Sequence, residues 1–383
     1  MKKPCILLLS LLMITWACGS KDKQQTSEAQ MDKSYLFLLG TYTENEGEGI
    51  NLVKFDPQQN RMEILALASD IKNPSFIISN EDQNLIFATE ETGGENGGKV
   101  TSYRLDKSAL KLEKIGSVYT QGDSPCHLSL DPSERFLIAS NYSGGNVTAI
   151  PVDQAGRLSQ EVQTIQHEGG SVNPNRQKAP HVHSAVFHPT ENKVFVADLG
   201  TDKIYIYNFD NQASAPLSQG ETIPFSVTAG SGPRHLLFDK EGDRLYLIHE
   251  LTGEIGVYDY ENGAISHLET HTLFPENFSG KVGAAEVRIS PDGNFLYASN
   301  RGEANNITAF KIKEDGLSKI QDMPSQGLAP RNFAISFDGK YLICSNQDSN
   351  KLEVFNRDEK SGEIHPAQTS LSVNKPVYVY FLD

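Results

Sequence analysis

The body of the chain alternates short apolar runs with turn sequences. The runs are rich in Val, Ile, Leu, Tyr and Phe, and turns such as DPS, SPDG and KEGD separate them. Short runs with these residues and boundaries are typical of antiparallel β-strands joined by tight connections. No segment of helical period is long enough to compete with them. The pattern therefore predicts an all-β protein.

The apolar pattern repeats along the chain. The stretch GPRHLLFDKEGDRLYLIHELTGEIGVYDY, which begins at Gly232, has counterparts beginning at Asn73, Ser124, Ala179, Gly283 and Ala329. Aligned positions are Pro74, Pro125, Pro180, Pro233, Ala285, Pro330 and Pro376, with spacings of 51, 55, 53, 52, 45 and 46 residues. Such periods are typical of solenoids and propellers. Each unit contains three strands and a weaker fourth run, which is the pattern of a propeller blade of four antiparallel strands.

The two ends of the chain complete the count of blades. SYLFLLGTYTENEGEGINLVKFDP, from Ser34, matches the second and third strands of a unit but lacks a first strand. KPVYVYFL, from Lys375 to Leu382, matches a first strand alone. Together they make a shared seventh blade beside six complete units. We predict a seven-bladed β-propeller over residues 34–383, closed by its C-terminal strand so that no sheet edge stays open.

The N-terminus has the features of an export signal. Two lysines precede an apolar run from Ile6 to Trp16, followed by Ala-Cys-Gly around Cys18. This order predicts a lipoprotein signal peptide over residues 1–17, lipid attachment to Cys18 and a flexible tether over residues 18–33. We therefore expect an exported protein, lipid-anchored to the bacterial cell envelope. Simple secretion is the alternative. The body cysteines, Cys126 and Cys344, are expected to be unpaired buried thiols.

The charge of the chain limits its partners. The formal net charge is −15, and it becomes −17 without the leader. So acidic a surface disfavours nucleic acid and anionic membrane surfaces, leaving the lipid as the expected membrane contact. It leaves room for an anionic substrate, because a local group of arginines can override the mean charge. The oligomeric state is not indicated by the sequence.

Polar and charged residues recur at two points of the repeat. In a propeller blade the start of the first strand and the loop after the second strand meet at one mouth of the central channel. The first-strand positions hold His127, His181, His183, Arg234, His235, Glu286, Arg288, Arg331 and Asn332, and the loop positions hold Glu90, Glu91, Asn141, Tyr142, Asp198, His249, Glu250, Asn300, Arg301, Asn346 and Gln347. The sequence therefore predicts a polar rim.

Part of this polar set has a structural explanation. The Asn or Asp after the second strand recurs so regularly that we interpret it as a link between blades. His188 matches a turn aspartate, and His167, His267, His271 and His365 are expected to be solvated. Residues that break the repeat indicate a site built on the symmetric frame, and these are His183, Arg234, Glu250 and Arg301.

The repeat motifs resemble those of a known family. GxxPRHLxF, HxxxxxxVFVADLGxDxIxxY, RISPDGxFLYASNR and PRNFxxSxDGxYL are similar to the propeller-type lactonases, which include bacterial 6-phosphogluconolactonase and fungal carboxy-muconate cyclase. The resemblance extends from about Ser34 to Asp383. It implies a seven-bladed fold and the opening or closing of a lactone ring without a metal or other cofactor.

The resemblance also implies an active centre of one His, one Glu and two Arg. The first Arg is Arg234 and the Glu is Glu250. The His is His183 in preference to His181, and the second Arg is Arg301 or Arg288. The other polar residues of the rim are candidate substrate-binding residues: His127, His181, His235, Glu286, Arg288 and Arg331.

These residue types suit the hydrolysis of a lactone. His183, expected near neutral pKa, or Glu250 could activate water, while arginine forks could hold an oxyanion, carboxylate or phosphate. No nucleophile elbow is present to indicate an acyl-enzyme, and no tight ligand spacing calls for a metal. A phosphorylated sugar lactone is a cytoplasmic metabolite, so export favours an unphosphorylated sugar lactone or another cyclic ester. A non-catalytic glycan-binding or protein-binding propeller and a cyclase or isomerase are the alternatives.

Lipid attachment can be tested through Cys18. The thioether needs its sulfur, so bacteria producing Cys18→Ala should lose the label that the parent protein takes from a radioactive fatty acid. Equal labelling of variant and parent would contradict lipidation.

Overall fold

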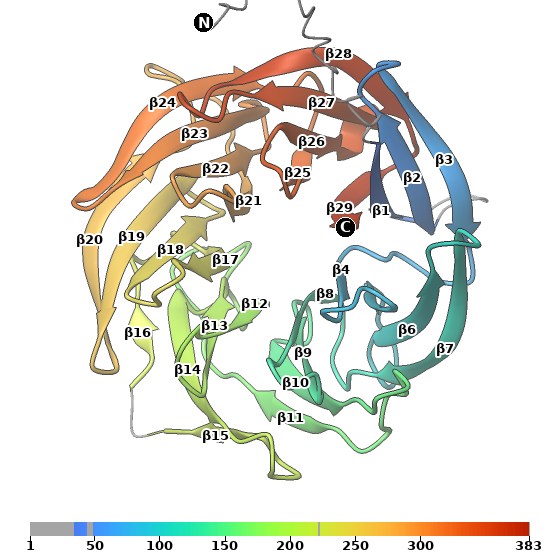
Figure 1. Cartoon of the computed structure of the whole chain (residues 1–383). Coiled ribbons are helices and arrows are strands. Elements are labelled where there is room, and N and C mark those ends of the chain that lie inside the picture. Colours follow the sequence, from blue (N-terminus) through green and yellow to red (C-terminus); the bar gives the residue numbers. More distant parts are fainter. Residues whose placement is uncertain (1–33, 44–48, 221–222, 383) are drawn as a thin grey trace, which may run out of the picture. The chain divides into compact units, whose positions relative to one another are not determined.

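The computed structural model describes residues 34–43, 49–220 and 223–382, and these form seven β-sheets arranged in a ring (Figure 1). The predicted signal peptide and tether, with Cys18, lie outside the described residues. The only helical element among the described residues is a single 3₁₀ turn, η1 (Gln347–Ser349). The prediction of an all-β, seven-bladed propeller is confirmed.

Most sheets have four antiparallel strands that follow one another along the chain. Their bounds, from the innermost strand outward, are β4 (Ile77–Ser79), β5 (Leu85–Glu90), β6 (Lys99–Asp106) and β7 (Lys111–Tyr119); β8 (Pro125–Leu130), β9 (Phe136–Asn141), β10 (Asn146–Pro151) and β11 (Gln163–Gln166); β12 (Val182–Phe187), β13 (Lys193–Asp198), β14 (Lys203–Phe209), β15 (Leu217–Gln219) and β16 (Phe225–Ser226); β17 (Pro233–Phe238), β18 (Arg244–His249), β19 (Glu254–Glu261) and β20 (Ala264–Thr272); β21 (Ala284–Ile289), β22 (Phe295–Asn300), β23 (Asn306–Lys313) and β24 (Gly316–Pro324); β25 (Pro330–Ile335), β26 (Tyr341–Asn346), β27 (Lys351–Arg357) and β28 (Ile364–Ser372). One sheet departs from four strands, because both β15 and β16 pair with β14.

The seventh sheet combines the two ends of the described chain. Its order is β29 (Pro376–Leu382), β1 (Tyr35–Thr41), β2 (Ile50–Asp56) and β3 (Arg61–Ala68). β29 pairs with β1 in antiparallel register, with Phe381 opposite Phe37. Both rings belong to an apolar cluster that includes Ile343 and Val354 of the preceding blade. The predicted closure by the C-terminal strand is confirmed.

The register of the first strands corrects the sequence alignment at two places. Pro125 lies opposite Asn141, and Pro233 lies opposite His249, at the end of each second strand. In the third repeat the equivalent residue is Val182, opposite Asp198, and not Pro180. The two-residue error arose because the connection before β12 is longer than its counterparts. In the fifth repeat the equivalent residue is Ala284, opposite Asn300, one residue before Ala285.

The free cysteines are buried in the fold, and several of the recurring polar residues hold the backbone by hydrogen bonds. Cys126 and Cys344 are both buried and unpaired. At the ends of second strands, the amide of Asn300 donates to Leu273 O at 3.0 Å, and that of Asn346 donates to Ser325 O at 2.9 Å. These two bonds tie the strand to the connection that enters its blade from the preceding one. The amide of Asn141 instead bonds within its own blade, to Asn146 Oδ1 at 2.6 Å, so the predicted link between blades is present at some of these positions and not at all of them.

Removing residues 375–383 should prevent folding or lower the melting temperature, because it opens the ring and exposes the partners of β29. The change Phe381→Ala tests the same contacts with less disruption, since truncation of a buried phenylalanine costs about 3–5 kcal/mol. Leu268→Ala is the control, because Leu268 is 41% exposed and lies on β20, in another blade. Unchanged thermal melts for both the deletion and Phe381→Ala would contradict the closure.

Candidate active site

Three of the candidates, His183, Arg234 and Arg331, occupy one repeated position in the first strands. In six of the seven first strands the register shifts just after the first residue, so that one extra residue forms a bulge. The residue that follows the first one in each of these six strands is Cys126, His183, Arg234, Ala285, Arg331 or Val377. Bulges re-aim side chains and occur beside active sites. His183 therefore occupies the position of Arg234, whereas His181 lies before its strand.

The second group occupies the position just after the second strand. Its backbone N–H donates to the carbonyl of the residue that precedes the first strand of the same blade, as in Glu250 N to Gly232 O at 2.8 Å and Arg301 N to Gly283 O at 2.9 Å. The residues placed in this way are Tyr42, Glu91, Tyr142, Leu199, Glu250, Arg301 and Gln347. The same backbone hydrogen bond thus presents a different side chain from every blade.

Glu250 is the centre of the charged cluster. Its Oε2 lies 3.1 Å from Arg234 Nε, 3.0 Å from Arg301 Nη2 and 3.7 Å from His183 Nε2. Its Oε1 accepts a hydrogen bond from Arg176 Nη2 at 2.6 Å. The structure therefore brings His183, Arg234, Glu250 and Arg301 together and adds a third arginine.

The cluster carries more positive than negative charge. Burial by itself raises the pKa of Glu250, but the neighbouring cations, led by Arg301 and Arg234, outweigh it and hold that pKa well below its usual range. Burial lowers the pKa of Arg234 to about 10, and the charge of Arg301 acts in the same direction. One carboxylate thus faces three guanidinium groups, so the site is suited to an added negative charge.

His183 is a neutral imidazole at neutral pH. Burial, followed by the charge of Arg234, lowers its pKa well below the usual value, which differs from the near-neutral pKa expected from the sequence. Its Nδ1 lies 3.6 Å from Cys126 Sγ. His181 is placed differently: its ring stacks on Tyr142 with centroids 4.5 Å apart, and its Nδ1 lies 2.9 Å from Tyr142 O.

A second layer of candidate residues includes His235, Glu286, Arg288 and Asn332. These residues contact one another, and none of them contacts Glu250. His235 Nδ1 lies 3.2 Å from Glu286 Oε1, and Asn332 donates to the other oxygen of that carboxylate. Arg288 Nε lies 3.5 Å from Glu286, and Arg288 Nη2 donates to Tyr378 OH at 3.1 Å. Arg301 and Arg288, which sequence could not separate, are therefore in different clusters.

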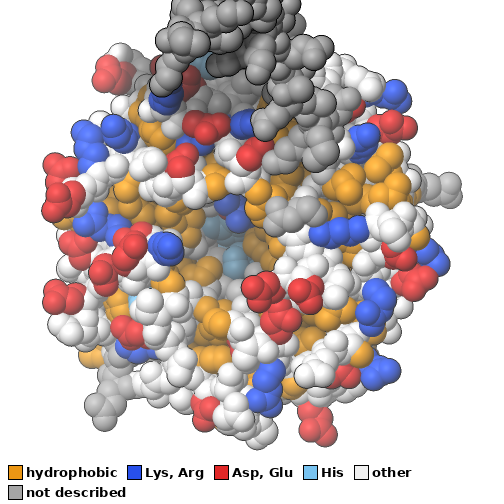
Figure 2. All heavy atoms as spheres, viewed as in Figure 1, with side chains coloured by type: hydrophobic (Ala, Val, Ile, Leu, Met, Phe, Trp, Pro, Cys, Tyr) orange, Lys and Arg blue, Asp and Glu red, His pale blue; other side chains and the backbone are white. Residues whose placement is uncertain are grey.

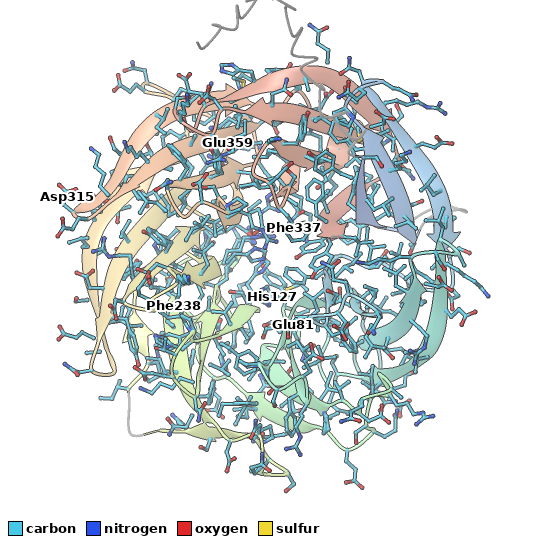
Figure 3. All side chains as sticks on the ribbon, viewed as in Figure 1. Glu81, His127, Phe238, Asp315, Phe337 and Glu359 are labelled. Atoms are coloured by element: carbon cyan, nitrogen blue, oxygen red, sulfur yellow. The ribbon has the colours of Figure 1, made fainter. Side chains whose placement is uncertain are left out.

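His127 also belongs to this second layer, and Figure 3 shows it near the centre of the ring. Its ring packs 4.3 Å from that of Phe76 and 5.5 Å from that of His235, measured between centroids. In Figure 2 the ring is hollowed at its centre, where histidine and Lys or Arg side chains are visible. The inner strands thus give the hollow a polar, nitrogen-rich lining.

Arg331 belongs to a third group. Its Nη2 lies 3.4 Å from Glu91 Oε2, and its guanidinium lies over the ring of Tyr42 at 5.3 Å from the centroid. Tyr42 OH donates to the same carboxylate at 3.1 Å. Arg331 therefore has an acid of its own, whereas three arginines share Glu250.

Sequence reasoning missed Arg176. It lies in the connection between β11 and β12, outside the repeated strands, so the comparison of equivalent positions could not identify it. The only indication was the unusual length of that connection. Arg176, Glu250 and Arg301 line a pocket of about 470 Å³, with Leu251, Val282, Gly283, Gly302, Leu328, Ala329, Gln347 and Asp348.

The prediction that His167 is solvated is wrong. His167 is 3% exposed; its Nδ1 lies 2.8 Å from Asp198 Oδ2 and its Nε2 lies 3.0 Å from Tyr207 OH. The connection that contains it folds back on β13 and β14, which the strand pattern could not indicate. His188 has the predicted structural role, since its Nδ1 accepts from Glu191 N in the turn at 3.0 Å.

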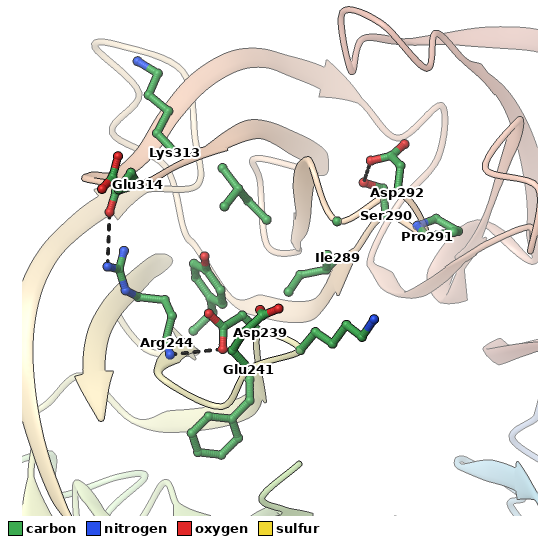
Figure 4. A pocket seen from close by; sticks show the side chains of 14 residues that line it. Asp239, Glu241, Arg244, Ile289, Ser290, Pro291, Asp292, Lys313 and Glu314 are labelled. Carbon is green, nitrogen blue, oxygen red and sulfur yellow. Dashed lines mark hydrogen bonds between the residues drawn. The ribbon is translucent and has the colours of Figure 1, made fainter. Parts of the chain in front are cut away.

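A larger pocket lies away from these clusters. It has a volume of about 770 Å³ and is formed by the turns after β17 and β21 and the turn after β23 (Figure 4). Its acids are used structurally, as in Asp239 Oδ1, which accepts from Arg244 N at 3.2 Å. None of the predicted site residues lines it. The 470 Å³ pocket is therefore the better candidate active site.

Neither a metal site nor a membrane span is evident in the part of the chain that the structure describes. Within residues 34–43, 49–220 and 223–382, no three His, Cys, Asp or Glu side chains are grouped so that they could hold a metal ion. The same residues include no helix with the length and apolarity to cross a membrane.

Comparisons with known proteins agree with the fold. A family model described as "Lactonase, 7-bladed beta-propeller" matches residues 36–381, so the chain belongs to this lactonase family. It is similar to 6-phosphogluconolactonase of Bacillus subtilis, with 29% identity over 91% of this chain and 98% of that protein. A protein named 6-phosphogluconolactonase from Formosa agariphila is 31% identical over 88% of this chain and 96% of its own length.

A solved structure extends the similarity to three dimensions. The periplasmic gluconolactonase of Pseudomonas aeruginosa matches with a TM-score of 0.86 and 36% identity, covering 92% of this chain and 99% of that chain. The names of these relatives describe lactone-hydrolysing enzymes. The enzyme class predicted from the sequence, a lactonase, is confirmed.

The buried histidines predict how stability depends on pH. Burial lowers the pKa of His127 to about 3, so below pH 6.5 the unfolded chain binds a proton that the folded chain does not. Stability should therefore fall as the pH drops from 6.5 toward 3, by about 1.4 kcal/mol per pH unit for each such histidine. His183 and His235 shift in the same direction.

Urea melts at pH 7, 6 and 5 check this dependence. His127→Gln should show a shallower loss of stability with acid than the parent, whatever its stability at pH 7. His365→Gln is the control, because that side chain is 59% exposed. Equal slopes for His127→Gln and the parent would contradict the neutral, buried state of His127.

Proposed function

We propose that this protein hydrolyses a sugar lactone of the kind opened by 6-phosphogluconolactonases, at the mouth of the propeller channel. The main observation in support is that side-chain nitrogens of His183, Arg234 and Arg301 all lie within 3.7 Å of Glu250 Oε2. The relatives named 6-phosphogluconolactonase and gluconolactonase support the substrate class. Both phosphorylated and unphosphorylated sugar lactones remain within this proposal.

Arg234 and Arg301 are the proposed donors to the oxyanion. Attack of water on the lactone carbonyl places negative charge on the carbonyl oxygen, and fixed donors lower the barrier by stabilising that charge. Other contacts hold both guanidinium groups: Arg234 Nη1 donates to Ala285 O, and Arg301 Nε donates to Gly283 O at 3.1 Å. Their positions are therefore set before a substrate binds.

His183 is the proposed general base. At neutral pH its ring is unprotonated, because burial and Arg234 lower its pKa, so a ring nitrogen is free to take a proton from water. The low pKa also makes it a weak base, so we assign the role by the free nitrogen and by its position beside Glu250 and not by basicity. Glu250 is the weaker candidate, because its two oxygens are already paired with three arginines. We assign Glu250 to holding the arginines and to stabilising the imidazolium that forms on His183.

We further propose that the reaction needs no metal ion. Three guanidinium groups around one carboxylate already provide the positive charge that a Lewis acid would otherwise supply. His127, His181, His235, Glu286, Arg288 and Arg331 remain proposed substrate-binding or channel-lining residues.

We propose that the protein is exported and lipid-anchored through Cys18. The sequence of residues 1–17 and the similarity to a periplasmic gluconolactonase support export. Residues 18–33 would then separate the propeller at 34–383 from the membrane. Loss of fatty-acid label in Cys18→Ala, described above, tests this proposal.

The proposed chemistry can be tested on a panel of aldonolactones, with and without phosphate, by following acid release. Arg301→Ala should lower kcat/KM by about 100-fold to 1,000-fold, as the loss of an oxyanion donor does. Glu250→Gln should lower kcat strongly, because the cluster loses its only carboxylate. EDTA treatment of the parent should leave the rate unchanged.

Arg61→Ala is the matched control, because the Arg61 side chain is 62% exposed on β3. Thermal melts recorded beside the kinetics separate catalysis from support of the fold. If Arg301→Ala and Glu250→Gln have lower melting temperatures but keep their specific activity, the cluster serves to stabilise the fold. That result would favour the alternative of a non-catalytic propeller that binds a glycan or a protein. An EDTA effect reversed by one divalent ion would contradict metal independence.

A further inference from the structure

The connection that contains Arg176 is clamped at both ends by one carboxylate. Asp198, the last residue of β13, holds His167 Nδ1 through Oδ2 at 2.8 Å. Its Oδ1 accepts from His181 N at 2.8 Å, after the connection has returned to the ring. In the corresponding position other blades have Asn141, Asn300 and Asn346. Asp198 thus fixes the start and the end of residues 168–180 at a single point.

The interior of the connection is fixed as well. Gln177 is fully buried; its Nε2 donates to Leu199 O at 2.9 Å and its Oε1 accepts from Asn173 N at 3.1 Å. In the same segment, Arg176 N donates to Asn173 Oδ1 at 3.2 Å. The backbone of Arg176 is therefore held by Asn173, which the buried Gln177 anchors, although the Arg176 side chain is 41% exposed.

Arg176 uses only part of its guanidinium in these contacts. Nη2 donates to Tyr142 OH at 3.0 Å and to Glu250 Oε1 at 2.6 Å. Among the contacts of the described residues, none engages its Nη1 or Nε. Nη1 carries two N–H groups, and each can donate a charge-assisted hydrogen bond to an oxygen of a carboxylate or a phosphate.

The three arginines around Glu250 differ in exposure. The side chain of Arg234 is 2% exposed, that of Arg301 is 19% exposed and that of Arg176 is 41% exposed. Arg176 and Arg301 line the same 470 Å³ pocket. Because one carboxylate cannot neutralise three cations, the outermost arginine is the one that an incoming anionic group meets first.

We infer that Arg176 is a specificity-determining residue, which binds an anionic substituent, carboxylate or phosphate, on the sugar lactone. This inference rests on the proposed function and extends it. Ring opening takes place at Arg234, Arg301 and His183, while Arg176 holds the charged end of the substrate at the outer side of the pocket. Asp198 is a positioning residue, which acts through the clamped connection.

The experiment compares lactones that differ in charge. Steady-state kinetics are measured for glucono-δ-lactone, its 6-phosphate and a glucarolactone that carries a carboxylate. Arg176→Ala should lower kcat/KM for the charged lactones by about tenfold to 100-fold more than for glucono-δ-lactone, mainly through KM, as expected for loss of a charge-assisted contact. Arg176→Lys should restore part of this preference, because it keeps the charge but not the several fixed donors of the planar guanidinium.

Two further variants separate this role from alternatives. Arg61→Ala removes a surface charge elsewhere and should preserve the preference of the parent. Asp198→Asn introduces the residue that other blades have at this position, so it should fold. It replaces the carboxylate oxygen that holds His167 Nδ1 by an amide NH2 group, which weakens that bond, so it should reproduce part of the selective KM defect. If Asp198→Asn keeps the preference of the parent for charged over neutral lactones, the positioning role of Asp198 is contradicted.

Equal losses for charged and neutral lactones in Arg176→Ala would overturn the specificity role and assign Arg176 to holding Glu250. If the parent hydrolyses none of the three lactones, the proposed function fails, and calorimetry with inorganic phosphate decides the role of Arg176 separately. Phosphate binding that is lost in Arg176→Ala supports the anion site, whereas equal binding, or none by the parent, overturns it.

Discussion

The site depends on the sharing of one buried carboxylate by three guanidinium groups. Buried charges are stable only when paired, and Glu250 is the only acid in direct contact with Arg176, Arg234 and Arg301 among the described residues. Its negative charge brings together arginines from a connection, a first strand and the end of a second strand. The surplus positive charge is the property that makes the pocket suitable for the oxyanion of lactone hydrolysis.

The propeller supplies equivalent positions, and the site uses them unequally. The bulge recurs in six of the seven first strands and the hydrogen bond after the second strand recurs in every blade, so most blades present two side chains in the same way. Only some blades place charged residues there. The symmetric frame determines where side chains lie, and the differences between blades determine the chemistry.

The sequence predicted most of the fold, because seven units with the same strand and turn pattern allow few arrangements. It also predicted Glu250, Arg234, His183 and Arg301, which stand out against the repeat. It could not separate Arg288 from Arg301, since their different partners depend on register and on the bulge. Arg176 and the buried state of His167 were missed because both belong to a connection that the repeat does not describe.

The pH dependence of kcat/KM for a neutral lactone is the most direct test of this charge-sharing. With Glu250 ionised and His183 unprotonated well below neutral pH, kcat/KM should stay flat from about pH 7.5 to pH 5, measured where the protein is folded. A fall with an apparent pKa between 6 and 7 would contradict it, because it would show that a group in the site gains a proton near neutrality.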